Sequence, residues 1–197
     1  MEHTHNTRRL YQAVGMGLAL LIGESSVQAF ELYADDDTRL SGNFLAVYGM
    51  FNSRKNYDGT PGGSTWREGF IKYGVSLEQR LGGLGSVYGT ANQVSSGTWG
   101  DGDASGVTTG SERTSQFDEA FAGWRSGELF PVLGTDGVDL SFGRQVIMLG
   151  DGFIINDDGT NLGKGVADGE FNRGGAYYLA ARHAFDQTAL DRKSTRL

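Results

Sequence analysis

The residue types that enzymes use most for proton transfer and metal binding are scarce in this chain. Two of its three histidines, His3 and His5, lie near the N-terminus, which leaves His183 for the rest of the sequence, and there is no cysteine. A Ser/His/Asp triad, a histidine-based zinc site or a thiol nucleophile therefore has little to draw on. No glycine-rich stretch ends in Gly-Lys-Ser/Thr, as a phosphate-binding loop would. The sequence predicts no catalytic residue, no cofactor and no enzyme activity, although its serines and aspartates leave an enzyme built on a barrel as a third, disfavoured alternative.

One acidic segment, 156–161, has a composition like that of a calcium-binding loop. It reads Asn-Asp-Asp-Gly-Thr-Asn, and side-chain oxygens are what Ca²⁺ binds. However, Ile154 stands where the first carboxylate of such a loop belongs, and Gly165 where the closing glutamate belongs. We therefore interpret the segment as a turn and predict no metal site.

Charged residues recur instead on one side of segments that alternate between apolar and polar residues, which is the period of a β-strand. In 66–81, Ile71 and Val75 lie on one side while Glu68 and Lys72 lie on the other. If the polar side faced a packed core, each unpaired charge would cost several kcal/mol to bury. A hydrated lumen removes that cost. The lumen-facing candidates are Arg39, Lys72, Arg80, Glu119, Arg125, Arg144 and Arg182.

Two roles are open for these side chains. A field of cations would concentrate an anion inside a confined pore. Alternatively, the arginines pair with carboxylates such as Glu78 and Glu119 and stiffen the wall, and the interspersed acids weaken the first role. The net charge of −7 argues against nucleic acid as a partner, since nucleic-acid-binding proteins are usually basic.

The elements that must position these charges are strands. The chain has 32 glycines, 2 prolines and an aromatic fraction of 11%, a composition typical of many strands joined by turns. A helix is disfavoured because each glycine within it costs about 1 kcal/mol. In the first alternating segment, Leu45 and Val47 interrupt the polar side. Six strands are predicted, at 40–50, 66–81, 86–94, 116–125, the alternating first half of 138–156, and 174–184.

The connections between these strands alternate in length. They are long at 52–65, short at 82–85, long at 95–114, medium at 126–137 and long at 150–174. In an antiparallel meander this places every long loop at one end, as in an outer-membrane barrel with short periplasmic turns, whereas a soluble β-sandwich seldom sorts its loops so regularly. Strands of about 9–11 residues also fit a tilted membrane crossing. We therefore predict an all-β, antiparallel up-and-down transmembrane β-barrel, which is incomplete because the smallest such barrels have about eight strands.

The two ends carry segments that do not belong to the predicted barrel. Residues 1–29 are interpreted as a signal peptide, because Arg8 and Arg9 precede an apolar stretch at 13–22. That stretch is shorter than the roughly 20 residues of a spanning helix. An acidic lead-in follows at 31–37, and the C-terminal residues have no periodicity. The predicted organisation is 1–29 signal peptide, 30–190 N-terminal part of a barrel, and 191–197 non-native tail.

The most specific pattern lies in the fifth predicted strand. It reads Leu-Ser-Phe-Gly-Arg-Gln at 140–145 and reaches Gly-Asp-Gly at 150–152 after a short apolar run. This pattern resembles the Gly-Arg-Gln … Gly-Asp signature of the alginate-export family of outer-membrane proteins, and Asp-Glu-Ala-Phe at 118–121 resembles the strand that precedes the signature there. The matching signature residues are Gly143, Arg144, Gln145, Gly150, Asp151 and Gly152.

The resemblance implies a porin-type barrel of roughly 18 strands in the bacterial outer membrane, with this chain as about its N-terminal third. It also implies outer-membrane lipid as a partner, and a charged lumen that passes anionic polysaccharide or other small solutes. The alternative function is a non-channel β-rich envelope protein, either an adhesin or a structural barrel. An extended gene is expected to encode about ten or more further alternating segments.

Arg144 is in conflict with strict alternation. Counting from Phe142, alternation places the arginine on the lipid face, where a cation costs about 2–4 kcal/mol near the midplane. We therefore predict a β-bulge at Gly143 or Arg144 that turns the side chain toward the lumen.

Overall fold

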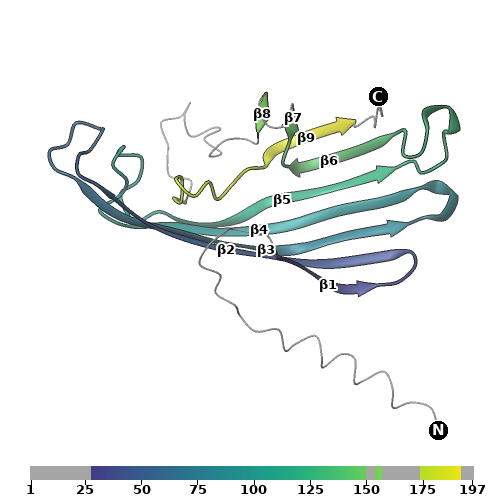
Figure 1. Cartoon of the computed structure of the whole chain (residues 1–197), viewed down its shortest axis with the longest axis horizontal. Helices are drawn as coiled ribbons and strands as arrows, with labels where there is room; N and C mark the ends of the chain where they lie inside the picture. Colours follow the sequence, from purple (N-terminus) through teal and green to yellow (C-terminus); the bar gives the residue numbers. More distant parts are fainter. Residues whose placement is uncertain (1–27, 150–153, 157–173, 192–197) are drawn as a thin grey trace, which may run out of the picture.

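The computed structural model describes residues 28–149, 154–156 and 174–191. Within them the protein is all-β: seven strands form one antiparallel sheet, and β7 (Met148–Leu149) and β8 (Ile155–Asn156) form a separate short pair (Figure 1). The strands of the sheet, in spatial order, are β1 (Gln28–Ala34), β2 (Thr38–Ser53), β3 (Ser64–Arg80), β4 (Ser86–Gly100), β5 (Arg113–Arg125), β6 (Asp139–Gln145) and β9 (Phe185–Asp191).

The sheet is a meander in which each strand pairs with the next one described along the chain. The connections 35–37, 81–85 and 126–138 join strands at one end, which we call the turn end, and two of them contain the 3₁₀ turns η1 (Gly82–Leu84) and η2 (Pro131–Leu133). The other connections meet at the opposite end, which we call the loop end (Figure 1). The predicted sorting by length is wrong, because 126–138 is longer than two of the connections at the loop end. The sheet formed by the described residues is not closed, and β1 and β9 are its edges. The connections at the loop end are 54–63, 101–112 and 146–184.

Five of the predicted strands are confirmed, as parts of β2 to β6. Four of these, β2 to β5, extend further into the predicted loops than their sequence indicates. Ser95 to Gly100, predicted as loop, continue β4 and pair with β3. The reason is tertiary, because Ser96 and Thr98 hydrogen-bond to the segment 174–184.

The prediction of a strand at 174–184 is wrong. This segment contains turns and no ladder pairing, and the strand lies further on, at β9. Ala176 and Ala180 adopt positive φ values of 55° and 49°, which an extended strand does not accommodate. Its apolar alternation comes from packing on the sheet rather than from pairing within it.

The acidic lead-in at 31–37 is corrected as well, because most of it belongs to β1, which pairs with the start of β2. Asp35 closes the intervening turn: its Oδ1 accepts the backbone N–H groups of Asp37 and Thr38 at 2.9 and 2.6 Å. The signal-peptide prediction lies almost entirely outside the described residues, and so does the proposed tail apart from Asp191, which ends β9.

The two faces of the sheet differ in chemistry. Successive side chains of a strand point to opposite faces, so the paired registers assign each residue to one of them. One face, which we call the apolar face, carries large hydrophobic side chains that are 38–60% exposed. These include Phe44, Tyr48, Ile71, Tyr73, Val75, Leu77, Phe117 and Phe142.

The opposite face, which we call the polar face, carries the charges, including Glu68 and Asp118, both 0% exposed.

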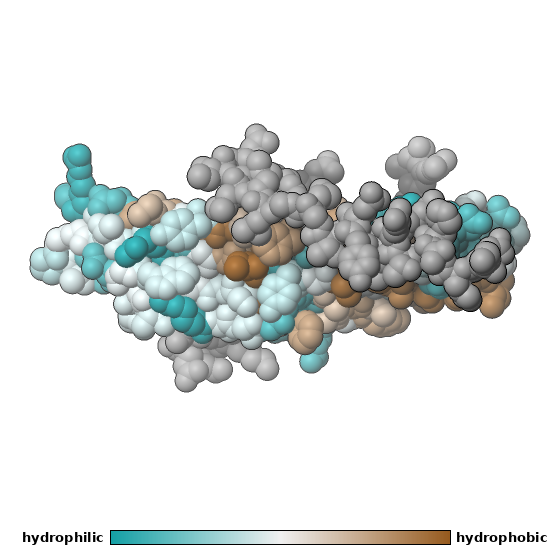
Figure 2. Space-filling view, turned by 90° about the horizontal axis from the view of Figure 1, so that it is seen from below, coloured by the Kyte–Doolittle hydropathy of each residue, from teal (hydrophilic) through white to brown (hydrophobic). Residues whose placement is uncertain are grey.

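Hydropathy also differs between the two ends of the sheet. Figure 2 shows hydrophobic side chains at the centre and toward the turn end, while the loop end is largely hydrophilic. No helix within the described ranges is long and apolar enough to cross a membrane.

Candidate functional site

The candidate site is the polar face, because the register brings five of the seven sequence-predicted charges onto it. Arg39 pairs with Glu78, Arg80 with Ser86, and Ser86 in turn with Arg125. The remaining residues that the register places on this face are Lys72 and Glu119. Arg182 reaches the same face from outside the sheet, and Arg144 is a special case.

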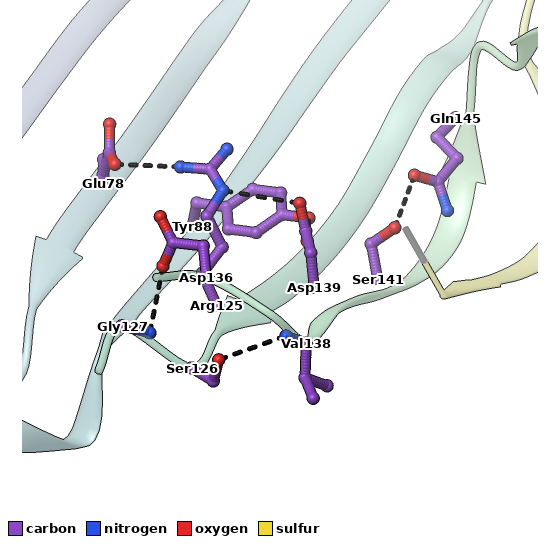
Figure 3. A network of polar contacts seen from close by, with 10 residues as sticks. All are labelled: Glu78, Tyr88, Arg125, Ser126, Gly127, Asp136, Val138, Asp139, Ser141 and Gln145. Atoms are coloured by element: carbon purple, nitrogen blue, oxygen red, sulfur yellow. Dashed lines mark hydrogen bonds and ion pairs between the residues drawn. The ribbon is translucent and has the colours of Figure 1, made fainter. Parts of the chain in front are cut away.

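At the turn end, Arg125 is the centre of a charged network (Figure 3). Its guanidinium lies 3.0 Å from Glu78 Oε1 and 3.5 Å from Asp139 Oδ2. It also stacks 4.2 Å from the ring centroid of Tyr88, whose hydroxyl donates to Asp139. Four side chains from β3, β4, β5 and β6 thus hold one another in place, and we call them the Arg125 network.

The connection after β5 supports this network. Ser126 Oγ accepts the backbone N–H of Val138 at 3.2 Å, and Asp136 Oδ1 accepts that of Gly127 at 3.0 Å (Figure 3). Both bonds draw the two ends of the connection together. They fix where Arg125 leaves β5 and where Asp139 enters β6.

A shallow depression of about 240 Å³ lies beside the network. The hydroxyls of Ser76 and Thr90 are 2.9 Å apart on its floor, and Asn43 Nδ2 donates to Ser76 Oγ at 2.8 Å. Guanidinium, carboxylate and hydroxyl groups of this kind can hydrogen-bond a passing solute, but they hold no nucleophile with a paired base. The polar side chains that line the depression are Arg39, Ser41, Ser76, Glu78, Tyr88, Thr90 and Arg125.

In the middle of the face, Asp118 sits at a β-bulge. The register between β4 and β5 shifts between Asn92 and Gln93, which leaves Asp118 as the extra residue of β5. Bulges re-aim side chains, and this carboxylate is fully buried. It forms an ion pair with Lys72 and accepts the backbone N–H of His183 at 3.1 Å.

Arg144 is also attached to Asp118, whose backbone carbonyl accepts its Nε at 2.7 Å. Its guanidinium further pairs with Asp186 of β9. The prediction of a bulge at Gly143 or Arg144 is wrong, because the register shift between Gly143 and Gln145 leaves the extra residue in β9 and not in β6. Against β5 the pairing is unbroken and keeps Arg144 opposite Ala120. The guanidinium of Arg144 is therefore held by Asp118 and Asp186 and is not redirected by a bulge in β6.

The other described residues of the signature bind β9 to β6. Gly143 has a φ of 127°, and a Cβ there would collide with the carbonyl oxygen of Ala120, so only glycine fits. Gln145 is buried; its amide donates to Thr188 Oγ1 at 2.7 Å and accepts from Ser141 Oγ at 2.9 Å. The signature residues Gly150, Asp151 and Gly152 lie outside the described residues.

Toward the loop end, segment 174–184 lies on the polar face, and we call it the inserted segment. Its backbone N–H groups donate to side chains of the wall: Ala176 to Thr98 Oγ1 at 2.9 Å and Leu179 to Glu68 Oε2 at 3.1 Å. The bond from His183 to Asp118 makes a third. Three different strands thus hold it.

Arg182 is buried by this docking, with 1% of its surface exposed. Its guanidinium donates to Ser96 Oγ at 2.6 Å and to the carbonyl of Gly175 at 2.8 Å. It is therefore a docking residue of the inserted segment rather than an open lumen charge.

Apolar packing lies beneath the inserted segment. Ala176 and Ala181 are buried against Phe70 and Val94 of the sheet. Leu45 and Val47, which interrupt the polar alternation of β2, pack against the same cluster together with Leu179. At the tip, Tyr178 lies 5.5 Å from Phe51 and 5.2 Å from Trp66, between ring centroids.

Sequence reasoning missed the docking role of Glu68, Ser96, Thr98 and Asp118. The two apolar residues in β2, Leu45 and Val47, are the signal that could have pointed to it, because apolar side chains on the polar side of a strand indicate that another segment packs there.

The loop end carries acidic side chains that cap loop backbone. Asp103 Oδ2 accepts the N–H of Thr108 at 2.6 Å, and Glu112 Oε1 accepts that of Thr109, also at 2.6 Å. Burial opposes ionisation of Glu112, but its hydrogen bonds from Thr109 and Gly110 outweigh burial and hold its pKa below the usual value. Within the described ranges no group of acidic residues and histidines could hold a metal ion.

Comparison with known proteins identifies no family. No family model, curated protein or solved structure matches the chain. The function must therefore be argued from the two faces and from what covers them.

Proposed function

We propose that this chain forms part of an outer-membrane β-barrel that passes solutes through a polar lumen. The observation that carries the proposal is the arrangement of the two faces. Large apolar side chains such as Ile71 and Val75 are about half exposed, while Glu68 and Asp118 of the opposite face are buried. A water-soluble protein has the reverse arrangement, because exposing apolar surface and burying charge are both unfavourable. Lipid on the apolar face removes the first cost, while the ion pair of Asp118 with Lys72 and the hydrogen bond from Leu179 to Glu68 offset the second.

The dimensions of the apolar face support a membrane crossing. Trp124 pairs with Val87 on β4, and twelve residue steps separate Val87 from Trp99 on the same face. At about 3.3 Å per residue and a tilt of about 40°, this distance spans roughly 30 Å along the membrane normal. The hydrocarbon core is about 30 Å thick, and tryptophans are enriched at both of its boundaries.

Both tryptophans are anchored in ways that suit a boundary. The indole N–H of Trp124 donates to the carbonyl of Leu84 at 2.9 Å, and the guanidinium of Arg113 lies 4.3 Å from the ring centroid of Trp99. Between them, polar side chains interrupt the apolar face, and three of these bond to one another: Ser115 Oγ lies 2.8 Å from both Gln93 Nε2 and Ser95 Oγ. Mutual bonding lowers the cost of placing polar groups beside lipid.

The open edges fit the same proposal. A barrel leaves no unpaired strand in the membrane, so β1 and β9 are proposed to pair with further strands of the same barrel. The meander order of the seven strands in the sheet supports an up-and-down barrel.

For the solute, we propose a channel of the alginate-export type that passes anionic polysaccharide or small solutes. The polar face limits what charge contributes to this. Arg125 is paired with Glu78 and Asp139, and Lys72 with Asp118, which favours a wall-stiffening role for these cations. Selection between solutes is therefore proposed to depend more on space and hydrogen bonding than on a cationic field.

The test is reconstitution of the complete gene product in planar lipid bilayers. We expect stepwise conductance. Membrane insertion with no conductance would refute the channel and leave the alternative of a structural barrel or adhesin. A product that stays soluble and monomeric without detergent would refute the membrane proposal itself.

A further inference from the structure

The inserted segment occupies the surface that the proposed function assigns to the lumen. We infer that segment 174–184 is an internal constriction: it narrows the solute path at the loop end, and its docking sets the size of solute that passes. This inference rests on the proposed channel function.

The first support is the number of strands that hold the segment. Side chains from β3, β4 and β5 accept the N–H groups of Leu179, Ala176 and His183. All three acceptors, Glu68, Thr98 and Asp118, are fully buried. A loop lying over the wall by chance would satisfy its amides with water. Here the wall supplies the acceptors, including two buried carboxylates.

The second support is the mixed chemistry of the docking surface. Arg182 contributes charge-assisted bonds to Ser96 and to the segment's own Gly175, while Ala176 and Ala181 contribute apolar burial against Phe70. Apolar side chains on a wall that faces water are unfavourable unless another segment covers them. The wall is therefore built to receive this segment.

The third support is the contrast along the face. The segment covers the rows from Lys72 toward the loop end, whereas the depression beside the Arg125 network is open. A packed layer adds roughly 10 Å to the thickness of the wall. Along the described wall, the path of a solute is therefore narrower at the inserted segment than beside the Arg125 network.

Docking can be tested without measuring transport. A Cβ built on Gly49 lies 3.2 Å from Leu179 Cδ2, and the chain has no native cysteine. The pair Gly49→Cys and Leu179→Cys in the complete gene product, assembled in the membrane, is expected to form a disulfide on mild oxidation. Each single cysteine variant is the control and gives no intramolecular bond. Failure of the pair to cross-link would overturn the inference, whatever the protein conducts.

Constriction is tested by moving the segment. Ala181→Asp places a carboxylate against Phe70 and Val94, where an unpaired charge is unfavourable, and is expected to undock the segment. With a layer roughly 10 Å thick removed, we expect single-channel conductance to rise about twofold and larger solutes to pass. The matched control is Ala180→Asp. Ala180 is partly exposed and has a φ of 49°, a conformation that aspartate tolerates. The conductance of this variant should therefore stay at the wild-type level.

Because Ala181→Asp could impair folding, the same substitution is also made in the double-cysteine variant. Oxidation should hold the segment in place and give wild-type conductance, and reduction should release it and widen the channel in the same molecules. Cross-linking with unchanged conductance in every state would show a docked segment that does not constrict, which would overturn the inference while the channel stands. If no protein conducts, the channel proposal fails and the constriction with it, and the cross-link alone would then report docking.

Discussion

The two halves of the polar face solve the same electrostatic problem in different ways. Near the turn end, Arg125 keeps about a third of its side chain exposed and shares two carboxylates across the surface. Toward the loop end, Asp118 is completely buried, and its partner Lys72 is 13% exposed. The first half holds its charges in contact with solvent, whereas the second half encloses them under the inserted segment.

This difference indicates what each half contributes. Exposed ion pairs contribute little to stability because water and salt screen them. Enclosed pairs are costly to break, because removal of one partner leaves a buried charge. The open half is therefore suited to contact with solutes, and the enclosed half to fixing structure. Substitutions in the two halves should differ in size and in salt dependence.

The largest effect is expected at Asp118. Asp118→Ala leaves Lys72 without its carboxylate and removes the acceptor for the His183 N–H, which should lower the free energy of unfolding by about 3–5 kcal/mol. Chemical denaturation of the folded protein measures this. Asp118→Asn keeps a side-chain acceptor and should lose less. A loss in Asp118→Ala no greater than that of Arg125→Ala would contradict the division between the halves.

The next largest effect is expected where β6 pairs with β9, the strand that follows the inserted segment. Gly143→Ala forces a Cβ toward the Ala120 carbonyl at a φ of 127° and should cost about 1–3 kcal/mol. Gly134→Ala is the control for positive φ alone, since its φ is 82° and nothing lies within 4 Å of its Cβ. Equal losses in the two variants would mean that the close approach to β5 contributes nothing.

In the open half, Arg125→Ala removes two partly exposed ion pairs and the stacking on Tyr88. After discounting for solvent screening, we expect a loss of about 1 kcal/mol. This loss should shrink when the salt concentration is raised, while that of Asp118→Ala should persist. Denaturation at two ionic strengths compares them, and an Arg125 effect that is indifferent to salt would contradict solvent exposure of this half.

Much of the fold could be predicted from the sequence because it depends on local alternation. The polar and apolar sides of β2 and β3 follow from residue type alone, and their register confirms the strands. The inserted segment could not be predicted in the same way. Tyr177, Leu179 and Ala181 alternate as a strand does. However, the segment turns at positive φ and is held by side chains far away in sequence. Local pattern cannot distinguish pairing in a sheet from packing onto one.

The candidate site, like the fold, could be predicted from the sequence only in part. Alternation alone places Arg39 and Arg125 on the polar face, but it cannot state which charges are covered. Asp118 escapes alternation altogether because a bulge adds it to β5. The covered half of the site therefore required the structure.

The smallest effect is expected outside the sheet, at Glu112 in the connection between β4 and β5. Its hydrogen bonds from Thr109 and Gly110 lower its pKa below the ordinary 4.5 despite burial. The unfolded state therefore binds this proton more readily, so the carboxylate contributes stability above about pH 4.5 that is lost as the pH falls through the folded-state pKa. Glu112→Gln removes this titration, so the stability of the wild type should exceed that of the variant at pH 6 and converge toward it near pH 3. Because the contribution is local to one connection, Glu112→Gln should leave the Gly49–Leu179 cross-link unchanged. If cross-linking instead falls at low pH with Glu112 present and stays unchanged in Glu112→Gln, this connection helps to hold the inserted segment. The enclosed half would then extend beyond the polar face.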